Sequence, residues 1–398
     1  MARPRIFIAM HYLELGGAET ALIGLLDALD FNRVDVDLFL YSHRGELMNF
    51  IPAEVNLLPE IREYSTIESP MVQALRKGCF GVVYGRLKSK VEFNKYRQRS
   101  NPKDGSAIFS YVAKYVTPHL PKISDKRYDL AISFLTPHNI VLEKVDARRK
   151  ICWIHTDYTK IDVDTALELP VWGRYDNIIS ISPSVTESFC TVFPSLLGKI
   201  IEIENILSPT IVKSRSEEYT PDEFNPSDFN ILSIGRFTYQ KNFDNIPDIC
   251  NHIIRLTGIK NLRWYIVGFG GEEEKIRQSI RDTGMANNVS ILGKKENPYP
   301  YIKACDLYVQ PSRYEGKSVT VREAQMLGKP VVITDYPTSK SQLDDNIDGI
   351  VAPLDNAMCA EKIAKVILNN DLRAELSHNA SIRDYSNRCQ IDKIYSLI

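Results

Sequence analysis

The stretch Leu307–Ile333 (LYVQPSRYEGKSVTVREAQMLGKPVVI) contains the pattern that decides the fold. A short apolar run at Leu307–Gln310 is followed by a turn, by a helix-forming stretch at Thr320–Leu327 and by a second apolar run at Pro330–Ile333. Short apolar strands that alternate with helices are typical of parallel sheets covered by helices on both faces. We therefore expect this stretch to form one strand–helix–strand unit of an α/β domain.

The same alternation continues on both sides of this stretch. In the second half of the chain we expect further strands at Phe229–Ile234, Leu262–Val267 and Val289–Leu292, and helices at Asn245–Arg255, Glu272–Asp282, Tyr299–Ala304 and Glu361–Leu368. In the first half we expect strands at Arg5–Met10, Val34–Tyr41, Leu130–Leu135, Lys150–His155 and Asn177–Ile181, and helices at Ala18–Leu29 and Ser184–Phe193. The pattern predicts an α/β protein with two doubly wound, Rossmann-like parallel-sheet domains.

Residues 204–230 interrupt this alternation. They are polar, contain proline and show no sustained apolar period, as is typical of a linker. A chain of 398 residues is long enough for two large domains. We expect an N-terminal domain at 1–208, a C-terminal domain at 209–382, and a C-terminal helix at 383–398 that packs back on the first domain.

The composition excludes several classes of protein. The 49 Lys and Arg residues balance 50 Asp and Glu residues, so the molecule as a whole has no field that attracts nucleic acid. No apolar run reaches the roughly 18 residues that span a membrane, and the apolar start is too short for a signal peptide. The seven scattered cysteines form no CxxC pair, which argues against a disulfide framework or a zinc ribbon. We expect a cytoplasmic protein.

A loop with two basic residues follows the first expected strand of the second domain. Gly235 and Arg236 come directly after Ile234, and Lys241 lies five residues beyond Arg236. Ligands of open α/β sheets bind at the carboxyl ends of the strands. The arginine and lysine are therefore candidates for binding two phosphates, and an ordinary solvated loop is the alternative.

Two further turns combine glycine with the start of a helix. Gly16 and Gly17 open the first helix, and Gly268 begins a Gly-Phe-Gly-Gly turn after the strand that ends at Val267. Glycine lets the backbone approach a ligand closely, and a helix N-terminus offers free N–H groups to an anion. Neither turn matches the dinucleotide pattern GxGxxG, and a purely structural turn is the alternative.

Two carboxylates bracket the turn in the stretch quoted above. Glu315 lies in the turn and Glu323 in the first turns of the next helix, with Gly316 and the N–H groups near Ser318 between them. Carboxylates can bind the hydroxyls of a sugar or a ribose, while the helix N-terminus binds phosphate. The alternative is that both acids only stabilise the helix dipole.

The first domain contributes a histidine and a possible metal site. His155 ends an expected strand and is a candidate ligand contact. Asp162 and Asp164 lie in a loop and could hold a divalent ion, whereas Asp35 and Asp37 lie at the start of a strand, the wrong edge. The two basic loop residues and the helix N-termini already offer counter-charge, so we expect no metal site.

Residues 72–103 form a strongly basic segment. Nine basic residues stand against a single acid, Glu92, and apolar and aromatic residues are interleaved with them: Arg76, Lys77, Arg86, Lys88, Lys90, Lys95, Arg97, Arg99 and Lys103 are basic, and Phe80, Val82, Val83, Tyr84, Leu87, Val91, Phe93 and Tyr96 are apolar or aromatic. The segment is either a solvated, partly helical insertion or a patch that binds an anionic membrane surface. No recognised motif supports nucleic acid.

Together these motifs resemble glycosyltransferase family 4, whose members are retaining enzymes of the GT-B fold, in particular those of bacterial polysaccharide biosynthesis. The residues that carry the resemblance are Gly16-Gly17-Ala18-Glu19, His155, Ser182-Pro183-Ser184-Val185, Asn205, Gly235-Arg236 with Lys241, Gly268-Phe269-Gly270-Gly271, Glu315 with Glu323, and Gly328-Lys329-Pro330-Val331-Val332. The resemblance implies two Rossmann-like domains that face a central cleft.

The resemblance also implies roles for single residues. Arg236 and Lys241 would neutralise the diphosphate of a nucleotide-sugar, with Gly235 and Gly268 in the loops that bind it. Glu315 would contact the donor sugar and Glu323 the ribose hydroxyls. His155 would contact the donor sugar or position the acceptor. The remaining groups would approach the phosphates: Gly16 and Gly17 from the first domain, and the N–H groups of Gly316, Lys317, Ser318 and Val319 from the second.

The implied function is transfer of a sugar, with retention of configuration, from a nucleotide-sugar to a glycan or lipid-linked acceptor in surface or capsular polysaccharide biosynthesis. A uridine diphosphate donor is the expected one, and no cofactor or essential metal is implied. Two alternatives stay open: a sugar-nucleotide epimerase of the same fold and a non-catalytic nucleotide-sugar-binding protein. The expected location is the cytoplasm, with peripheral attachment to the inner face of the membrane through residues 72–103.

Overall fold

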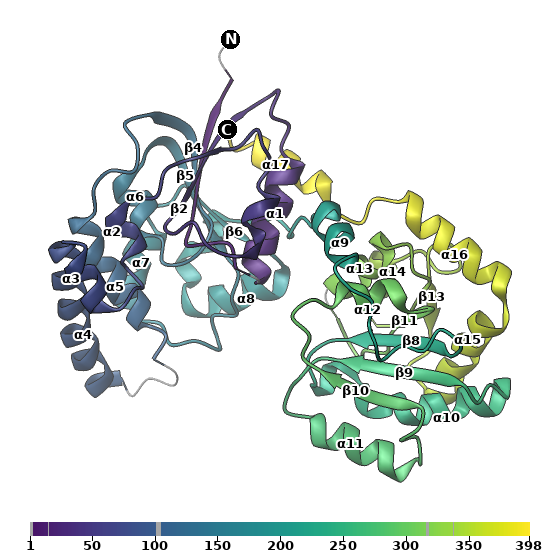
Figure 1. Cartoon of the computed structure of the whole chain (residues 1–398). Coiled ribbons are helices and arrows are strands. Elements are labelled where there is room, and N and C mark those ends of the chain that lie inside the picture. The colour runs from purple at the N-terminus through teal and green to yellow at the C-terminus, as the bar shows by residue number, and fades with distance from the viewer. Residues whose placement is uncertain (1–2, 15, 101–104, 316–317, 337) are drawn as a thin grey trace. The chain divides into compact units, whose positions relative to one another are not determined.

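A computed structural model describes residues 3–14, 16–100, 105–315, 318–336 and 338–398 (Figure 1). The chain divides into two compact units, of which unit 1 contains residues 1–208 and 387–398 and unit 2 contains residues 209–386. The boundary at which the chain leaves unit 2 lies after residue 386, four residues later than the expected boundary after residue 382. Arg383 and Tyr385 both bind the carboxylate of Asp348, which ties the segment before residue 387 to unit 2.

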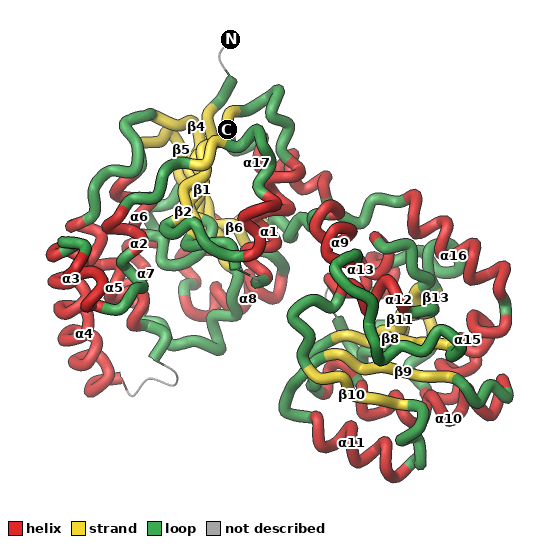
Figure 2. The backbone as a smooth tube through the Cα atoms, viewed as in Figure 1, coloured by secondary structure: helices red, strands yellow, loops and turns green. Residues whose placement is uncertain are grey.

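Unit 1 is built on a sheet of seven parallel strands in the order β3-β2-β1-β4-β5-β6-β7. The strands are β1 (Arg5–Met10), β2 (Asp35–Leu40), β3 (Asn56–Leu57), β4 (Arg127–Ser133), β5 (Asp146–Ile154), β6 (Asn177–Ser180) and β7 (Ile200–Glu202). β1 is buried from Ile6 to Met10, as expected of a strand covered on both faces. Figure 2 shows these strands at the centre of the unit with helices outside them.

The helices of unit 1 include an insertion between β3 and β4. The helices are α1 (Gly17–Ala28), α2 (Arg62–Ser65), α3 (Met71–Arg76), α4 (Phe80–Ser100), α5 (Ile108–Val116), α6 (Asn139–Lys144), α7 (Thr165–Trp172), α8 (Pro183–Val192) and α17 (Ile391–Tyr395). The basic segment therefore forms α3 and the long helix α4. One side of α4 is buried through Val82, Val83, Ser89 and Phe93. The insertion is thus part of the packed unit.

Unit 2 repeats the architecture with six parallel strands in the order β10-β9-β8-β11-β12-β13. The strands are β8 (Phe229–Ile234), β9 (Leu262–Val267), β10 (Val289–Gly293), β11 (Leu307–Gln310), β12 (Val331–Thr334) and β13 (Ile350–Ala352). The helices are α9 (Pro209–Ser216), α10 (Ile246–Thr257), α11 (Glu273–Asp282), α12 (Tyr299–Ala304), α13 (Val319–Met326), α14 (Ser339–Gln342), α15 (Asn356–Leu368) and α16 (Asn370–Ile382).

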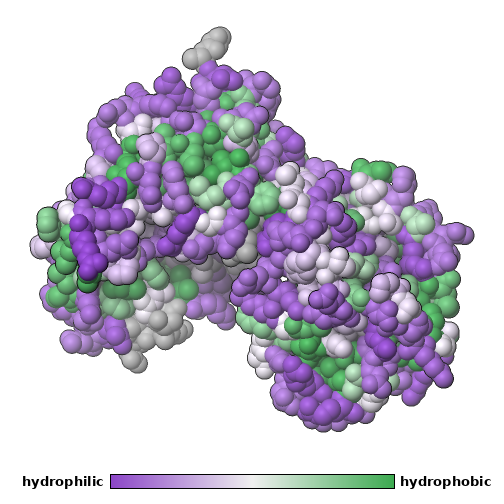
Figure 3. All heavy atoms as spheres, in the orientation of Figure 1, coloured by the Kyte–Doolittle hydropathy of each residue, from purple (hydrophilic) through white to green (hydrophobic). Residues whose placement is uncertain are grey.

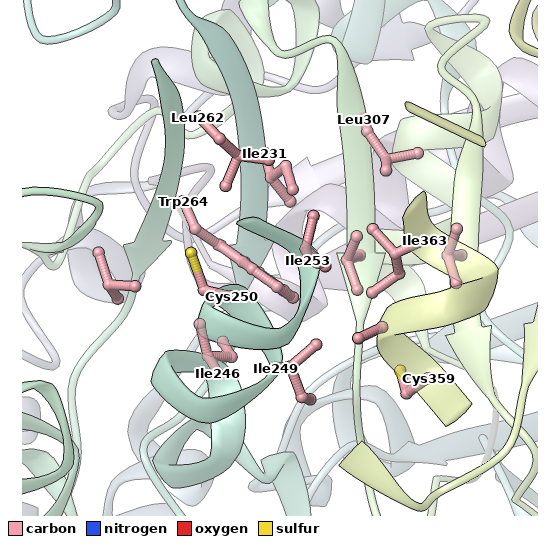
Figure 4. Packing of buried hydrophobic residues seen from close by; sticks show 14 of the residues in the cluster. Ile231, Ile246, Ile249, Cys250, Ile253, Leu262, Trp264, Leu307, Cys359 and Ile363 are labelled. Carbon is pink, nitrogen blue, oxygen red and sulfur yellow. The ribbon is translucent and has the colours of Figure 1, made fainter. Parts of the chain in front are cut away.

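The core of unit 2 lies between the sheet and the helices α10 and α15. Trp264 of β9 is fully buried in a cluster that contains Cys250 and Ile253 of α10 and Ile363 of α15 (Figure 4). Helix α10 places apolar residues on one face, and Gly258, with φ +72°, ends it in the left-handed conformation that glycine favours. The two parallel-sheet domains that the sequence predicts are confirmed.

One detail of the chain, in the expected linker, differs from expectation, whereas the C-terminal segment behaves as expected. The expected linker contains α9, which buries Ile211 and Val212, because a helix of two turns is too short to show an apolar period. The C-terminal segment 387–398 returns to unit 1, where the hydroxyl of Tyr395 accepts from the Asp30 N–H at 2.7 Å. Within the described ranges, no helix has both the length and the apolar character that crossing a bilayer requires.

Candidate functional site

The carboxyl ends of β8 and β9 carry two turns that pack directly against each other. The N–H of Gly235 donates to the carbonyl of Val267 at 3.0 Å. Gly268 has φ +151°, and a Cβ atom added to it would lie 1.9 Å from the carbonyl oxygen of Gly235. Only glycine fits this position, because the contact is with backbone that cannot move aside. The two turns thus hold the expected ligand-binding loops at one edge of the sheet.

A largely buried ion pair lies at the same edge, between the loops after β8 and β11. Lys241 Nζ lies 2.5 Å from Glu315 Oε1, and the two side chains are 16% and 7% exposed. Gln240 Nε2 donates to Glu315 Oε2 at 3.1 Å, and the Ser312 hydroxyl donates to Oε1 at 2.7 Å. The structure thus pairs two residues that we expected to contact different parts of a ligand.

Gln240 and Ser312 were not predicted as site residues. Ser312 follows a strand that ends at the ligand-binding edge, and that position could have marked it. The sequence around Gln240 carries no comparable signal, because its contact depends on a loop 75 residues further along the chain. Both side chains fix the Glu315 carboxylate, which in turn orients the Lys241 ammonium group.

The other residues expected to contact phosphate differ in exposure and in whether their N–H groups are already hydrogen-bonded. Arg236 is exposed in the loop after β8, and Val319 is the first residue of α13. The N–H of Ser318 donates to Gln342 Oε1 at 2.7 Å, so a phosphate would have to displace this α14 side chain to reach it. The expected role of Ser318 stays a prediction. Gly316 and Lys317 lie outside the described residues.

Glu323 is the second carboxylate of the pattern and lies on α13. Its side chain is buried, and the hydroxyl of Tyr299 donates to Oε1 at 2.9 Å. Burial raises the pKa of the Glu323 carboxyl to about 7, against the hydrogen bond from Tyr299, which lowers it. A simple helix-dipole role does not require burial, so this carboxylate is a candidate for binding hydroxyl groups.

His155 follows β5 at the carboxyl edge of the other sheet. Its ring lies 4.9 Å from that of Phe134, and burial lowers its pKa to about 4. The imidazole is therefore neutral at physiological pH and can exchange hydrogen bonds without carrying charge. Its Nε2 atom is buried and has no hydrogen-bond partner among the residues that the structure describes.

The glycine pair of unit 1 is less constrained than that of unit 2. A Cβ atom on Gly16 would meet only the end of the Glu19 side chain, at 2.1 Å, and one on Gly17 would meet nothing within 4 Å. Burial raises the pKa of the Glu19 carboxyl, which lies over the start of α1. An anionic ligand at this helix start would need the Glu19 carboxyl to move or take up a proton.

The two aspartates that could have held a metal have structural partners. Asp162 Oδ2 accepts from the Gly105 N–H at 2.9 Å. Asp164 caps α7 through the Leu167 N–H and also accepts from the Tyr111 hydroxyl at 2.6 Å. Across the described part of the chain, no group of three or more histidine, cysteine, aspartate or glutamate side chains is arranged to hold a metal ion.

Comparison with known proteins finds a family model that matches most of unit 2. Residues 215–383 match the family model described as glycosyl transferases group 1. The predicted resemblance to glycosyltransferases is therefore confirmed for a region that includes the Lys241–Glu315 pair and Glu323. The finer assignment to family 4 and the retention of configuration stay predictions.

Curated relatives match part of the chain. It is 24% identical over 172 residues to the lipopolysaccharide core biosynthesis glycosyltransferase LpsE of Rhizobium meliloti. The matched region covers 42% of this chain and 49% of that protein. It is 27% identical over 169 residues to the poly(ribitol-phosphate) alpha-N-acetylglucosaminyltransferase of Staphylococcus aureus, covering 41% of this chain and 34% of that protein. The chain spans half or less of the length of these relatives.

Solved structures match the fold over its whole length. The Anabaena protein HepE, crystallised with UDP and glucose, has a TM-score of 0.59 at 16% identity, with 100% of both chains covered. Staphylococcus aureus TarM, in a mutant form crystallised with UDP, has a TM-score of 0.57 at 15% identity, with 99% of both chains covered. At such identities the likeness shows that the fold is shared.

Proposed function

We propose that the protein is a glycosyltransferase that moves a sugar, with retention of configuration, from a UDP-sugar to a glycan or lipid-linked acceptor in surface polysaccharide biosynthesis. The observation that carries the proposal is the buried Lys241–Glu315 pair at the carboxyl edge of the unit 2 sheet. It lies within the region that matches the glycosyl transferase model. The names of the relatives and the UDP in the HepE crystals support the donor and the biosynthetic role.

The chemistry required of such a site is mainly electrostatic. Negative charge grows on the diphosphate as the sugar leaves, and a fixed cation in a site that excludes water stabilises that charge. Lys241 supplies the cation, and Glu315, itself fixed by Gln240 and Ser312, keeps the ammonium group in place before the donor binds. Arg236, exposed in the same loop, supplies a second, bidentate phosphate contact.

The two carboxylates then divide the donor between them. Glu315 retains lone pairs beyond those used by its three donors, and these accept from hydroxyls of the donor sugar. Glu323 accepts from the ribose hydroxyls once its buried carboxyl is ionised. His155, neutral and with Nε2 unpaired among the described residues, contributes a hydrogen bond to the sugar or the acceptor.

A screen of nucleotide-sugars by mass spectrometry tests the reaction class. The purified chain is incubated with a panel of UDP-, GDP- and dTDP-sugars, with and without glycan acceptors, and free nucleotide and products are measured. A transferase releases nucleoside diphosphate and does so faster with an acceptor. An epimerase converts one nucleotide-sugar into another without such release, and a binding protein changes none of them.

We also propose that the enzyme is cytoplasmic and works at the inner face of an anionic membrane through α3 and α4. The side of α4 opposite its buried face exposes Phe80, Tyr84, Leu87 and Val91 by 68%, 56%, 51% and 54%. These residues recur every three or four positions and so form one stripe along the helix. Apolar side chains gather at the left edge of Figure 3, over α3 and α4.

Basic residues accompany this stripe, as expected of a helix that lies in a membrane interface. The exposed ones on α3, α4 and the turn between them are Arg76, Lys77, Lys88, Lys90, Lys95, Arg97 and Arg99. Each basic residue near an acidic leaflet contributes roughly 1 kcal/mol, reduced by salt. Arg86 is not among them, because it donates to the carbonyls of Thr66 and Ser69 inside the unit.

Co-sedimentation with liposomes tests this location. A variant with Lys88, Lys90, Lys95, Arg97 and Arg99 changed to Gln is expected to lose binding to anionic vesicles, and one with Phe80, Leu87 and Val91 changed to Ser to bind them more weakly. A matched control changes exposed basic residues of unit 2, namely Arg277, Arg281 and Lys303. Equal binding to anionic and neutral vesicles, or no loss in either α4 variant, removes the membrane from the proposal.

A further inference from the structure

Unit 1 contains a second candidate site, separate from the residues discussed so far. A cavity of about 590 Å³ lies at the carboxyl ends of β1, β2 and β4, the edge at which ligands of such sheets bind. Its walls are largely apolar, with Ile108, Phe109 and Val112 from α5 and Ile67 from the turn before α3. Its polar groups include His11, the first residue after β1, and Glu68.

The His11 ring is held in one orientation. Its Nδ1 atom lies 2.8 Å from Glu68 Oε1, and the ring stacks on Tyr41 with 4.7 Å between centroids. A carboxylate can only accept, so Nδ1 carries a proton. Nε2 is buried and has no hydrogen-bond partner within the described ranges. A ligand that forms a hydrogen bond with Nε2 would satisfy this buried polar atom.

The partner of His11 is itself fixed by the insertion. Arg86 of α4 donates to the carbonyls of Thr66 and Ser69, on either side of Glu68. The hydrogen bond from His11 holds the pKa of Glu68 below its ordinary value, against the effect of burial, so the carboxyl stays ionised. A phosphate placed at His11 would lie beside this negative charge, which argues against a second nucleotide site.

We propose that this cavity binds the acceptor, and that the acceptor is amphipathic: an apolar chain or ring lies against Ile67, Phe109 and Val112, and a hydroxyl forms a hydrogen bond with His11 Nε2. That the ligand is the acceptor rests on the transferase function proposed above, whereas its amphipathic character rests on the cavity itself. Sites for small ligands commonly combine apolar walls with a few fixed polar groups in this way. Arg86 and Glu68 act as positioning residues for His11.

Matched pairs of simple acceptors test the apolar wall. Methyl and octyl glycosides of glucose, galactose and their N-acetylamino forms, kept below the critical micelle concentration, are offered with the donor that the screen identifies. The octyl glycoside is expected to show a kcat/KM about tenfold or more above its methyl partner, because its additional methylene groups leave water. Equal values across the panel overturn the proposal.

Three variants locate the effect. Val112→Trp fills the cavity and is expected to bring the octyl-to-methyl ratio to about one, while Leu197→Trp, at an exposed position elsewhere in unit 1, keeps it. His11→Phe preserves the stack on Tyr41 and is expected to lower kcat/KM for both glycosides about tenfold with the ratio unchanged. An unchanged ratio in Val112→Trp, or unchanged transfer in His11→Phe, overturns the cavity assignment.

Two further measurements separate this inference from the proposed function. Release of nucleotide to water without acceptor is expected to be the same in all three variants, since all three substitutions lie in unit 1 and the donor is proposed to bind in unit 2. If no donor is cleaved by any form, the transferase function fails. Calorimetry of octyl against methyl glycoside with the native chain and Val112→Trp then still decides whether the cavity takes an amphipathic ligand.

Discussion

Units 1 and 2 share an architecture but differ in the chemistry at the carboxyl edges of their sheets. In unit 2 this edge carries charge that is fixed in place: the Lys241–Glu315 pair with the donors Gln240 and Ser312 around it. In unit 1 the corresponding edge carries an apolar cavity and His155, which burial keeps neutral. Figure 1 shows the two sheets, each with its own helices.

The difference fits the proposed division of the fold between two kinds of ligand, a donor in unit 2 and an acceptor in unit 1. A departing diphosphate needs preorganised positive charge, and such charge stays in place only where carboxylates and hydroxyls hold it. A glycan or lipid-linked acceptor carries no developing charge and is bound by apolar surface and single hydrogen bonds. On this basis, changes to charge should have large effects in unit 2, and changes to shape should have their effects in unit 1.

The largest effect is expected from Lys241→Ala. Loss of the fixed cation should lower kcat by about 10²–10³, or roughly 3–4 kcal/mol, as loss of one donor to a developing negative charge does elsewhere. Steady-state release of nucleotide at saturating donor measures this. Lys275→Ala is the control, because the Lys275 side chain is 53% exposed and its ion pair is with Asp244, not with Glu315. Near-normal turnover in Lys241→Ala and in Arg236→Ala would mean that unit 2 is not the charged half of the site.

The two carboxylates of unit 2 should separate by ligand. Glu323→Ala should lower the affinities for UDP and for UDP-sugar equally, by about 10-fold or more, because a hydrogen bond to a charged group is worth roughly 1.5–3 kcal/mol. Glu315→Ala should weaken the binding of the UDP-sugar more than that of UDP, since the proposed contact of Glu315 is with the donor sugar. Isothermal titration calorimetry with both ligands measures the ranking, and the reverse ranking would exchange the two roles.

The pH dependence of UDP binding should identify Glu323. Its pKa is about 7, so lowering the pH from 8 to 6 protonates most of the carboxyl and should weaken UDP binding about tenfold. Glu323→Gln should flatten this dependence.

The stability of the ligand-free protein should depend on pH in the opposite direction from UDP binding: it should rise as the pH is lowered. Because the folded pKa is raised above the unfolded one, the folded state binds the additional proton between about pH 4.5 and 7. The contribution of Glu323 to stability is therefore present below this window and lost as the pH rises through 7. Thermal unfolding of the native chain and Glu323→Gln measures the difference; a native profile that matches the variant would disprove the raised pKa.

The smallest effect is expected from chelation. On the proposed assignment Lys241, Arg236 and the start of α13 supply the counter-charge, so EDTA should leave transfer within about twofold. Activity assays before and after dialysis against EDTA measure this. Full loss that Mn²⁺ or Mg²⁺ restores would instead point to Asp162 and Asp164, and the Asp162→Asn variant would then be inactive as well.

Much of the fold could be predicted from local pattern. The strand Arg5–Met10 was predicted with the bounds it has, and Phe229–Ile234 and Leu262–Val267 likewise, because a strand buried on both faces is a continuous apolar run. The edge strands β3, β7 and β13 have two or three residues each, and α9 has two turns. Elements this short show no period, so only their packing reveals them.

The sequence singled out several residues of the candidate site but none of their pairings. A glycine turn after a strand indicates a ligand-binding edge, which is why Gly235, Gly268 and Glu315 stood out. The partners of those residues come from distant parts of the chain: Lys241 lies 74 residues from Glu315, and Gln342 lies 24 residues from the N–H of Ser318 that it occupies. No spacing rule reaches across such separations.

The sequence by itself thus determined the two parallel-sheet domains, the loops at their carboxyl edges and the basic character of residues 72–103, because each depends on residues that are neighbours in the chain. Only the tertiary structure decided which groups meet. It placed Arg86 inside the unit, joined His11 to Glu68 across 57 residues, and opened an apolar cavity beside them. Contacts of this kind follow from packing, in which segments far apart in sequence share one surface.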